Sequence, residues 1–581
     1  MTTTKNALFK SGEIRKTIYK NEWWFLMSSV IAFLADFLNS AQHFERMKAR
    51  HLSLIFFIFC ATFFVFGISK VSATTGVQNL IYVDCTSGID QAGCGEIGLP
   101  CESVTYAAQY LDGGLDVAHP DTMYIKGTCS IVGSTSYNAP TVYPRGNYCK
   151  FTTWPGQPRA FLDGGASPTG TVLGKTYVRS NNITVDNLKI NGEVSFRYSD
   201  NLLLTNIEFF GGGTTDYTNL GQWNDVLFIE DCMNGMVLNS EFHDANGASA
   251  YGSMVTYYGK SNSDTTPANF TFRNNSFYVT PGFAKPSLGI FLKQNSRMVN
   301  VDHNFFYNLW GGVFTSNQVP NGDVENINNN IFSSCGNSST EHGAITLMAN
   351  QLDVNIYNNT FVNSVWADIG NKWNQVTFGS WNNLFYGTTP FYIMIYNNSS
   401  MNSLAYYLNY NDYYDPSATP SWYDEANFTT FSSWQSHIIG LLKANVTEVD
   451  SLYADPGFIN ASGLFNTPSD FKRSSYPSNG RGGIYPSAMG AYITGNEIIG
   501  YTDLETPLII RSDVDNSSAT NTTDALLTLR NSLGLSMNGT AWINSATTGD
   551  VNCDEVSNST DALLILRYSL GLSMNGTSWC E

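Results

Sequence analysis

One phrase, an Asn shortly before a Phe, recurs along the middle of this 581-residue chain and constrains the fold more than any other feature. Its aromatic positions are Phe209, Phe242, Phe277, Phe306, Phe332, Phe361 and Phe385, and they are separated by 33, 35, 29, 26, 29 and 24 residues. Repeats of about 20 to 50 residues are typical of solenoids, in which each repeat contacts only its neighbours. The sequence therefore predicts one elongated core instead of several globular ones.

The residues around each phrase alternate between apolar and polar, as in Val354-Asn355-Ile356-Tyr357-Asn358. A period of two predicts short β-strands, and the Gly, Asn and Ser clusters between them predict turns. Asn tolerates a left-handed backbone, and stacked side-chain amides hydrogen-bond along a column. We therefore expect an Asn ladder at the turns and an aromatic stack in the interior, both structural.

Charge is scarce: 13% of residues are charged, with 30 Lys plus Arg against 48 Asp plus Glu. The formal charge of −18 leaves no basic surface for phosphates, which argues against nucleic-acid binding. In stacked coils, equivalent side chains lie about 4.8 Å apart, so like charges would repel. A solenoid thus accounts for the low charge.

Two further groups of segments resemble the ends of a known fold. The first are IYVDCTSGID from Ile81, LPCESVTYAAQYL from Leu99 and DTMYIKGTC from Asp121; the second are ADPGFIN from Ala454, SDF from Ser469 and MGAY ending at Tyr492. With the repeated phrase, they resemble the right-handed parallel β-helix family of secreted proteins, whose fold is shared with pectate lyases. The resemblance covers about residues 80–492 and implies a mainly β solenoid that opens with a strand and a capping helix. It does not imply an activity, because the repeat encodes stacking.

Clusters of charge in the solenoid are the candidate sites of chemistry. We select five candidate catalytic residues: Glu230, Asp231, Asp244, Lys293 and Arg297. Asp225, His243, Asp302 and His303 lie near them in the sequence, and Glu341 with His342 form a further pair.

These residues allow two kinds of enzyme. Carboxylates would hold Ca²⁺ against an acidic sugar while Lys293 or Arg297 abstracts a proton, as in a β-helix polysaccharide lyase. Alternatively, Glu230 or Asp231 would act with Asp244 as the two carboxylates of a glycoside hydrolase. Adjacent strand residues face opposite ways, so Glu230 and Asp231 share a groove only if the chain bends. The structural alternative is that all are solvated charges at turns.

Aromatic residues outside the phrase allow sugar stacking or simple packing. They include Trp310, Trp366, Trp373, Tyr413 and Tyr414.

The C-terminal region repeats itself: residues 513–542 and 550–579 are 37 residues apart and identical at 20 of 30 positions. Oxygen-bearing side chains recur at loop positions 1, 3, 5, 9 and 12 of each copy, a spacing that suits Ca²⁺, and an apolar helical pattern follows each loop. These ligands are Asp513, Asp515, Ser517, Asn521 and Asp524 in the first copy and Asp550, Asn552, Asp554, Asn558 and Asp561 in the second.

This duplicated loop and helix resembles the dockerin family. The resemblance implies a small all-α calcium-binding domain over 512–581, preceded by a linker over 493–511, that binds a cohesin module on a scaffold or surface protein. Two departures concern the loops: Ser517 adds no charge at position 5, and Ser518 and Glu555 replace the usual loop glycine.

Cys553 and Cys580 occur only in the second copy, where Asn516 and Ile543 are their counterparts in the first. Because both are absent together, we expect them to form a disulfide with each other.

The N-terminus carries a targeting pattern. Residues 52–69 are 18 uncharged residues after a basic stretch, and Val71-Ser72-Ala73 follows. We predict a signal peptide over 47–73 with cleavage after Ala73, the alternative being an uncleaved membrane anchor. Residues 1–46 form an extension of unknown role, consistent with a misassigned start. Nine cysteines follow the apolar run, and their spacing favours disulfides in an oxidising compartment over zinc.

The sequence as a whole predicts a secreted or cell-surface β-helix that acts on or binds extracellular polysaccharide and is tethered through a calcium-dependent dockerin. Enzyme, in the form of a lyase or glycoside hydrolase, and non-catalytic adhesin or carbohydrate-binding surface protein both remain open, as does a passive spacer.

Overall fold

The computed structural model describes two regions of the chain. The first comprises residues 78–131, 142–165, 171–175, 181–211, 225–245, 252–259, 266–283, 288–293, 296–316, 324–348, 350–372, 375–387, 390–395, 405–417, 420–442 and 445–502; the second comprises 512, 514–515, 520–537, 540, 542, 549–552, 556–570, 572, 574 and 577–579. The predicted extension 1–46, the signal segment 47–73 and the Cys553–Cys580 pair lie outside these residues. Among the described helices, none is long and apolar enough to span a membrane.

Three long parallel sheets make up the first region. Sheet 1 contains β1 (Leu80–Asp84), β2 (Asp121–Lys126), β4 (Cys149–Thr153), β7 (Ile183–Asp186), β9 (Leu203–Thr205), β12 (Met236–Leu238), β15 (Thr271–Arg273), β18 (Asn300–Asp302), β21 (Val324–Asn328), β24 (Asn350–Tyr357), β27 (Gln375–Trp381) and β30 (Ala405–Leu408). Sheet 2 contains β3 (Thr128–Ser130), β5 (Ala160–Asp163), the first half of β8 (Leu188–Arg197), β10 (Glu208–Gly211), β13 (Glu241–His243), β16 (Ser276–Tyr278), β19 (Phe305–Tyr307), β22 (Ile331–Ser333), β25 (Thr360–Val362), β28 (Leu384–Tyr386) and β31 (Asp412–Tyr414). Sheet 3 contains β6 (Thr171–Lys175), the second half of β8, β11 (Leu227–Glu230), β14 (Ser253–Tyr258), β17 (Leu288–Lys293), β20 (Gly311–Ser316), β23 (Ile345–Leu347), β26 (Ala367–Asn371), β29 (Phe391–Ile395) and β32 (Trp422–Asp424), which ends in an antiparallel pair with β33 (Asn427–Phe428).

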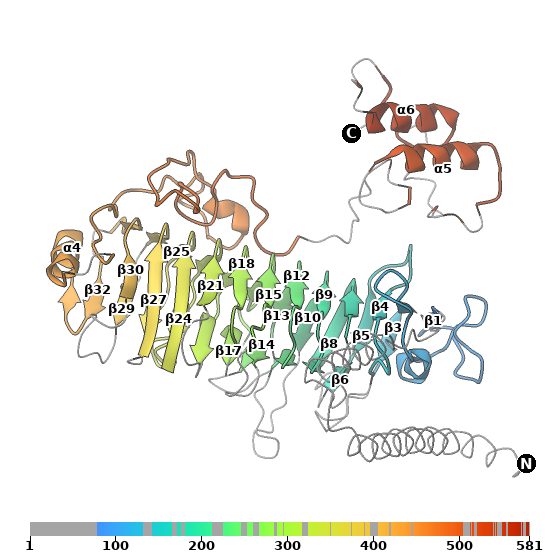
Figure 1. Cartoon of the computed structure of the whole chain (residues 1–581), viewed down its shortest axis with the longest axis horizontal. Coiled ribbons are helices and arrows are strands. Elements are labelled where there is room, and N and C mark those ends of the chain that lie inside the picture. Colours follow the sequence, from blue (N-terminus) through green and yellow to red (C-terminus); the bar gives the residue numbers. More distant parts are fainter. Residues whose placement is uncertain are drawn as a thin grey trace, which may run out of the picture. The chain divides into compact units, whose positions relative to one another are not determined.

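The chain visits sheets 1, 2 and 3 in turn, and each strand pairs with its equivalent in the next coil, as β12 does with β15 and β15 with β18. Figure 1 shows the strands of successive coils side by side. The arrangement is that of a parallel β solenoid and confirms the predicted mainly β fold with long parallel sheets.

The predicted aromatic stack runs through the interior. From Phe209 to Phe385, the ring centroids of successive phrase residues lie 4.6–5.0 Å apart. Tyr413 extends the stack at 4.8 Å from Phe385 and is fully buried, so it packs in the core and is not available to a sugar. The phrase therefore has the structural role that its spacing predicted.

The two roles predicted for Asn, a left-handed turn and a hydrogen-bonded amide ladder, belong to neighbouring residues. A buried amide ladder joins Asn275, Asn304, Asn330, Asn359, Asn383 and Asn411, with each side-chain amide donating to the next Oδ1 at 2.9–3.1 Å. The residue just before each ladder position has a positive φ, as at Asn329 (55°) and Asn358 (53°). The left-handed residue turns the chain from sheet 1 to sheet 2, and the next residue builds the ladder.

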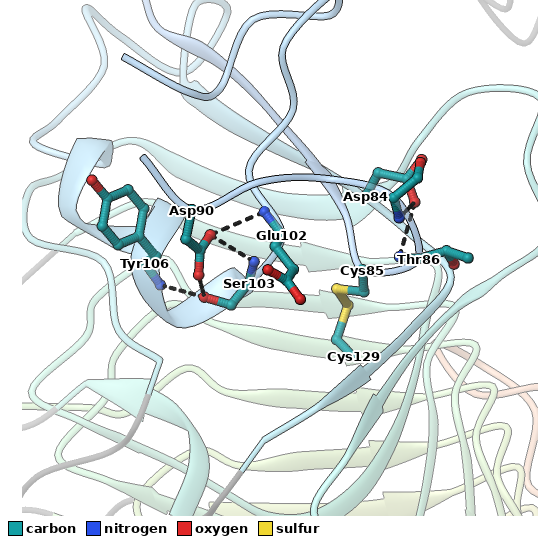
Figure 2. The surroundings of a disulfide bond; sticks show 9 residues. Asp84, Cys85, Thr86, Asp90, Glu102, Ser103, Tyr106 and Cys129 are labelled. Carbon is teal, nitrogen blue, oxygen red and sulfur yellow. Dashed lines mark hydrogen bonds between the residues drawn. A yellow bond between two sulfur atoms is a disulfide. The ribbon is translucent and has the colours of Figure 1, made fainter. Parts of the chain in front are cut away.

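The N-terminal end is closed by a cap that contains two disulfides, Cys85–Cys129 and Cys94–Cys101. Figure 2 shows Asp90, whose carboxylate accepts from the backbone N–H groups of Glu102 and Ser103 at 2.9 Å. Ser103 caps α3 (Val104–Ala107), which continues as η1 (Ala108–Tyr110). The opening strand, the capping helix and the predicted disulfides are thus present, and disulfides fit an oxidising compartment.

At the other end, α4 (Phe431–Gly440) follows β33, and the chain then returns along the solenoid. We call residues 445–502 the return segment; it includes η3 (Pro468–Phe471), and Figure 1 shows it in orange beside the yellow and green coils. The turn residues Asn358 and Asn382 donate to its backbone carbonyls at Ala488 and Pro486, at 2.7 and 2.8 Å.

The return segment covers the outer face of sheet 2 from β19 to β28. Its Phe458, Phe465, Phe471, Met489, Ala491, Tyr492 and Ile499 pack with Phe305, Ile331, Val362, Leu384 and Tyr386 of the sheet. The segments that resemble a closing pattern, between Ala454 and Tyr492, belong to this cover. It ends near the earlier coils, where Tyr501 accepts a hydrogen bond from Arg159 at 2.7 Å.

The second region contains α5 (Thr522–Ser532) and α6 (Ser559–Ser569), which match the two predicted helices. Ala525 of α5 packs with Val551 and with Leu564 and Ile565 of α6. The assignment of this region to the dockerin family stays a prediction.

We expect Asn330→Ala to destabilise the solenoid because it removes several buried hydrogen bonds, including the one that Asn330 Oδ1 accepts from the backbone N–H of Asn304. The free energy of unfolding in urea, followed by tryptophan fluorescence, should fall by about 2–4 kcal/mol. Exposed Asn496→Ala is the control. Equal effects of the two substitutions would contradict the structural role of the ladder.

Candidate functional site

Charged and aromatic side chains gather on the outer face of sheet 3, in the coils of β8, β11, β14 and β17. The strands pair in register, so Arg197, Glu230, Tyr258 and Lys293 form one outward column. Phe228, Thr256 and Phe291 form a second column beside it. We call these residues, with Glu193 and Asp225, the sheet 3 cluster.

Glu230 is bound to a neighbouring coil. Its Oε2 lies 2.8 Å from Nη1 of Arg197, and both side chains are mostly buried. The Arg197 guanidinium also lies over the Phe228 ring, with 4.7 Å between its Cζ and the ring centroid. A half-buried pair of this kind is stronger than an exposed one, and it fixes the position of the Glu230 carboxylate.

Lys293 lies over two aromatic rings. Its Nζ is 5.6 Å from the ring centroid of Tyr258 and 5.6 Å from that of Phe291. Burial lowers the pKa of Lys293, and the charge of Asp225 partly opposes this shift. An amine with a lowered pKa is a better proton acceptor near neutral pH than an ordinary lysine.

Asp225 precedes β11 and is 1% exposed. Its Oδ1 accepts hydrogen bonds from Ser253 Oγ at 2.6 Å and Thr256 Oγ1 at 3.0 Å, whereas its Oδ2 has no hydrogen-bond partner among the described residues. Burial raises the pKa of Asp225 to about 7, and the nearby charge of Glu193 adds to the shift. The carboxyl group therefore changes its charge near neutral pH.

The cluster thus combines a lysine whose pKa is lowered by burial, a carboxylate paired with Arg197, a buried carboxyl group and aromatic rings. Perturbed pKa values of several groups on one surface are a common mark of functional sites. Proton transfer to or from a bound molecule is chemistry that this arrangement can perform.

Of the five predicted catalytic residues, the structure brings Glu230 and Lys293 together on sheet 3. Asp231 has a φ of 48° and begins the turn after β11, so the chain does bend at this point. Arg297 lies in another connection from sheet 3 to sheet 1 and is 5% exposed. Asp244 follows β13 of sheet 2, so Glu230 and Asp244 belong to different sheets.

Glu193, Arg197 and Tyr258 were not selected from the sequence. Arg197 and Glu230 are 33 residues apart, the same separation as Phe209 and Phe242. The 33-residue separation of Phe209 and Phe242 therefore already indicated that Arg197 and Glu230 occupy equivalent positions in successive coils.

Asp244 belongs to a network on sheet 2. Its Oδ2 lies 3.1 Å from Nδ1 of His243, whose Nε2 lies 3.3 Å from Glu208, and Lys189 is 2.6 Å from the same Glu208 oxygen. Burial alone would lower the pKa of His243, but hydrogen bonds to the two carboxylates raise it overall. The positive charges of Lys189 and His243 are balanced by the carboxylates of Glu208 and Asp244. We therefore interpret the network as a structural ion cluster.

The other residues named from the sequence have packing contacts. His342 is buried and packs edge-on against Phe314, and burial lowers its pKa to about 4, with the charge of Lys372 adding to the shift. Asp302 is held by Arg273 at 2.5 and 2.6 Å. Trp310 and Trp366 pack in small apolar clusters, whereas Trp373 lies outside the described residues.

Seven of the ten predicted calcium ligands are described, and Asp513, Ser517 and Asp554 are not. Asn521 and Asn558 cap the two helices, and each is followed by Asp524 or Asp561 in an equivalent capping box. Burial raises the pKa of Asp524, and the charge of nearby Asp515 adds to it. Two carboxylates close together with neutral oxygen donors suit a hard cation such as Ca²⁺.

Among the described residues, one group of three potential metal ligands has its ligand atoms within 4.8 Å of one another: Asp90, Cys94 and Cys101. Because both cysteines form the Cys94–Cys101 disulfide, this group is not a metal site.

We expect Asp225→Asn to change how stability depends on pH. The folded-state pKa of about 7 exceeds the ordinary value near 3.9. The contribution of Asp225 to the free energy of unfolding is therefore fully present at low pH and is lost as the pH rises through 7. The Asn side chain keeps the Oδ1 acceptor without a charge. Relative to the wild type, the variant should gain a few kcal/mol of unfolding free energy between about pH 4 and 8. A difference that stays constant across this range would contradict the assignment.

Comparisons with known proteins add little. No protein-family model matches the chain, and no curated protein matches it. Among solved structures, a rhamnogalacturonan lyase is 13% identical, with 61% of this chain and 92% of that chain covered and a TM-score of 0.39. A GH136 lacto-N-biosidase from Eubacterium ramulus is 11% identical, with 59% and 64% covered and a TM-score of 0.30. ORF18 of Geobacillus virus E2 is 11% identical, with 60% and 58% covered and a TM-score of 0.29. At this level of similarity, the matches carry no conclusion about the substrate or partner of this chain.

Proposed function

We propose that the chain is a secreted or cell-surface right-handed β-helix that cleaves an extracellular polysaccharide on the outer face of sheet 3. The observation that carries this proposal is the position of Lys293, with a lowered pKa, over the rings of Tyr258 and Phe291 beside the Arg197–Glu230 pair. Sheet 2 offers less room for a polymer because the return segment covers it from β19 to β28.

The reaction that best uses Lys293 is the elimination catalysed by a polysaccharide lyase. The uncharged amine takes the proton on the carbon next to the sugar carboxylate, the glycosidic carbon–oxygen bond breaks, and a carbon–carbon double bond forms. The leaving oxygen takes a proton from solvent. Arg197 supplies positive charge near the carboxylate of the substrate, and the partly exposed ring of Tyr258 provides stacking surface.

The test of this activity uses the full chain and a panel of uronate-containing and neutral polysaccharides. Lys293→Gln should reduce the appearance of unsaturated products, measured by absorbance, by at least about 100-fold. Lys150→Gln removes a lysine paired with Asp186 on sheet 1 and should leave the rate unchanged.

Two outcomes would overturn the proposal. New reducing ends without unsaturated products, insensitive to Lys293→Gln, would indicate a glycoside hydrolase. Retention on immobilised polysaccharide without any cleavage would indicate the non-catalytic adhesin or carbohydrate-binding surface protein.

We further propose that residues 512–581 form a calcium-dependent dockerin that binds a cohesin module on a scaffold or surface protein. The support is the repetition of both loops and both helix starts, together with a groove between α5 and α6. Its lining consists of four pairs of equivalent residues: Thr522 and Ser559, Ala525 and Ala562, Leu526 and Leu563, and Leu529 and Leu566. Leu526 and Leu563 are 64% and 66% exposed, so the groove offers apolar surface to a partner.

When bound, Ca²⁺ would neutralise the carboxylates of each loop and fix the loop against its helix. We expect Asp524→Asn and Asp561→Asn each to remove one equivalent of Ca²⁺ bound by the full chain, measured by isothermal titration calorimetry. Asp455→Asn, at an exposed position of the return segment, is the control. Unchanged stoichiometry in both loop variants would contradict the calcium assignment, and cohesin binding that survives chelation of calcium would contradict the dockerin assignment.

A further inference from the structure

Arg481 of the return segment lies over three aromatic rings beside sheet 1. Its Cζ is 3.9 Å from the ring centroid of Tyr407, 4.7 Å from that of Tyr485 and 4.8 Å from that of Trp381. Such contacts hold a guanidinium group in place without using its N–H donors. Within the described part of the chain, no carboxylate pairs with this guanidinium and no acceptor takes a hydrogen bond from it. Because the side chain is partly exposed, its donors can bind an anion from solution.

One amide side chain fixes this part of the return segment. Asn382, in the turn after β27, accepts a hydrogen bond from the backbone N–H of Arg481 at 2.7 Å and donates one to the carbonyl of Pro486 at 2.8 Å. The backbone carbonyl of Asn382 also accepts from the N–H of Gly490 at 2.7 Å. These bonds tie the loop to the coil, so Arg481 and Tyr485 are in position before a ligand arrives.

Tyrosine hydroxyl groups surround the guanidinium. Tyr357 on β24 stacks on Trp381 of β27, with 5.0 Å between the ring centroids, and Tyr485 meets both rings edge-on. The side chains of Tyr357, Tyr407 and Tyr485 are partly exposed, and none of their hydroxyl groups bonds to another residue that the structure describes. A guanidinium and three hydroxyl groups that lie together in this way suit a ligand with several hydrogen-bonding groups.

A hollow of about 400 Å³ opens on the same face of sheet 1. Its lining consists of Val324, Asp353, Asn355 and Thr377. Asp353, Asn355 and Tyr357 alternate along β24 and so share the outer face. Asn355 and Tyr407 occupy the same register position with β27 between them. Two strand spacings, about 10 Å, therefore separate the hollow from the ring beneath the guanidinium.

We propose that this face of sheet 1 binds a short saccharide that carries one carboxylate, at a site separate from the surface proposed for cleavage. The guanidinium of Arg481 forms paired hydrogen bonds with the carboxylate. The hydroxyl groups of Tyr407 and Tyr485 bond to the same sugar residue. The hollow receives the neighbouring sugar, whose hydroxyl groups bond to Asp353 and Asn355.

The charges on this face decide which sugar lies where. Asp353 lines the hollow, and a second carboxylate placed there would be repelled by it. The site therefore selects an acidic sugar residue at Arg481 next to a neutral one in the hollow. Binding here leaves sheet 3 unoccupied, so this site holds a saccharide without reacting with it.

The experiment titrates the full chain with D-galacturonate and follows the broadening of the ligand NMR signals. This probe has the carboxylate and one sugar ring but no glycosidic bond, so cleavage cannot consume it. Arg481→Gln should weaken binding at least about 10-fold. Arg145→Gln removes the same charge at an exposed position before β4, and its affinity should stay within about twofold of the wild type.

Tyr407→Phe is the second variant, because it keeps the ring beneath the guanidinium and removes only a hydroxyl group. It should weaken binding about 3-fold without unfolding the chain. If Arg481 only covers the rings, the wild type and both variants will bind D-galacturonate equally, which would overturn the proposal.

Two further probes test the ligand class. D-galactose lacks the carboxylate and should bind at least about 10-fold more weakly than D-galacturonate. Equal affinity for these two sugars would overturn the carboxylate assignment, and acetate that binds as tightly as D-galacturonate would overturn the sugar assignment. None of these measurements involves Lys293, so a failure of the proposed cleavage on sheet 3 is observed separately from a failure of this site.

Discussion

The in-register stacking of parallel strands is the constraint on which the rest of the structure depends. Each side chain has its own equivalent as nearest neighbour in the coils before and after it, at the strand spacing of about 4.8 Å. Residues that interact well with copies of themselves are therefore favoured at repeated positions. Phe rings stack and Asn amides donate to one another, which explains the buried stack from Phe209 to Phe385 and the ladder from Asn275 to Asn411.

The same constraint decides where charge can be placed. Glu208 and Glu241 lie in register in neighbouring coils of sheet 2, and this repulsive pair is accompanied by Lys189, His243 and Tyr278. On sheet 3, Arg197 and Glu230 alternate in sign along one column. Where sheet 2 becomes apolar on its outside, at Phe305 and Ile331, the return segment covers it. On sheet 3, Phe228, Thr256 and Phe291 are buried, and the partly exposed side chains of the cluster are those at the strand ends, such as Tyr258 and Lys293.

The fold was predictable because its signal is repeated. The seven Asn-Phe phrases predict the length of a coil, and the apolar-polar alternation around each phrase predicts a strand. Together they predict that equivalent strands stack in successive coils, without knowledge of any single contact. The return segment was harder to predict, because its contacts join residues as distant as Asn239 and Thr502 and have no period. The sequence did show short segments between Ala454 and Tyr492, but not the face that they cover.

The candidate site was only partly predictable for a related reason. Residues close in sequence, such as Glu230 and Asp244, fall on different sheets, whereas Arg197 and Glu230 meet because one coil separates them. Coil length varies, so the residue that lies beside Glu230 in the next coil, Tyr258, follows no fixed interval. Burial of Asp225 is a property of the packed coils and cannot be read from its neighbours in the chain.

The central claim is that the outer face of sheet 3 is the surface that meets the polysaccharide. Hydroxyl-radical footprinting of the full chain, with and without a bound polysaccharide, tests it most directly. We expect the polymer to protect Tyr258, on sheet 3, from oxidation and to leave Tyr82 and Tyr124, on sheet 1, unchanged; all three are partly exposed in the free protein. Protection of Tyr82 and Tyr124 with no change at Tyr258 would contradict it.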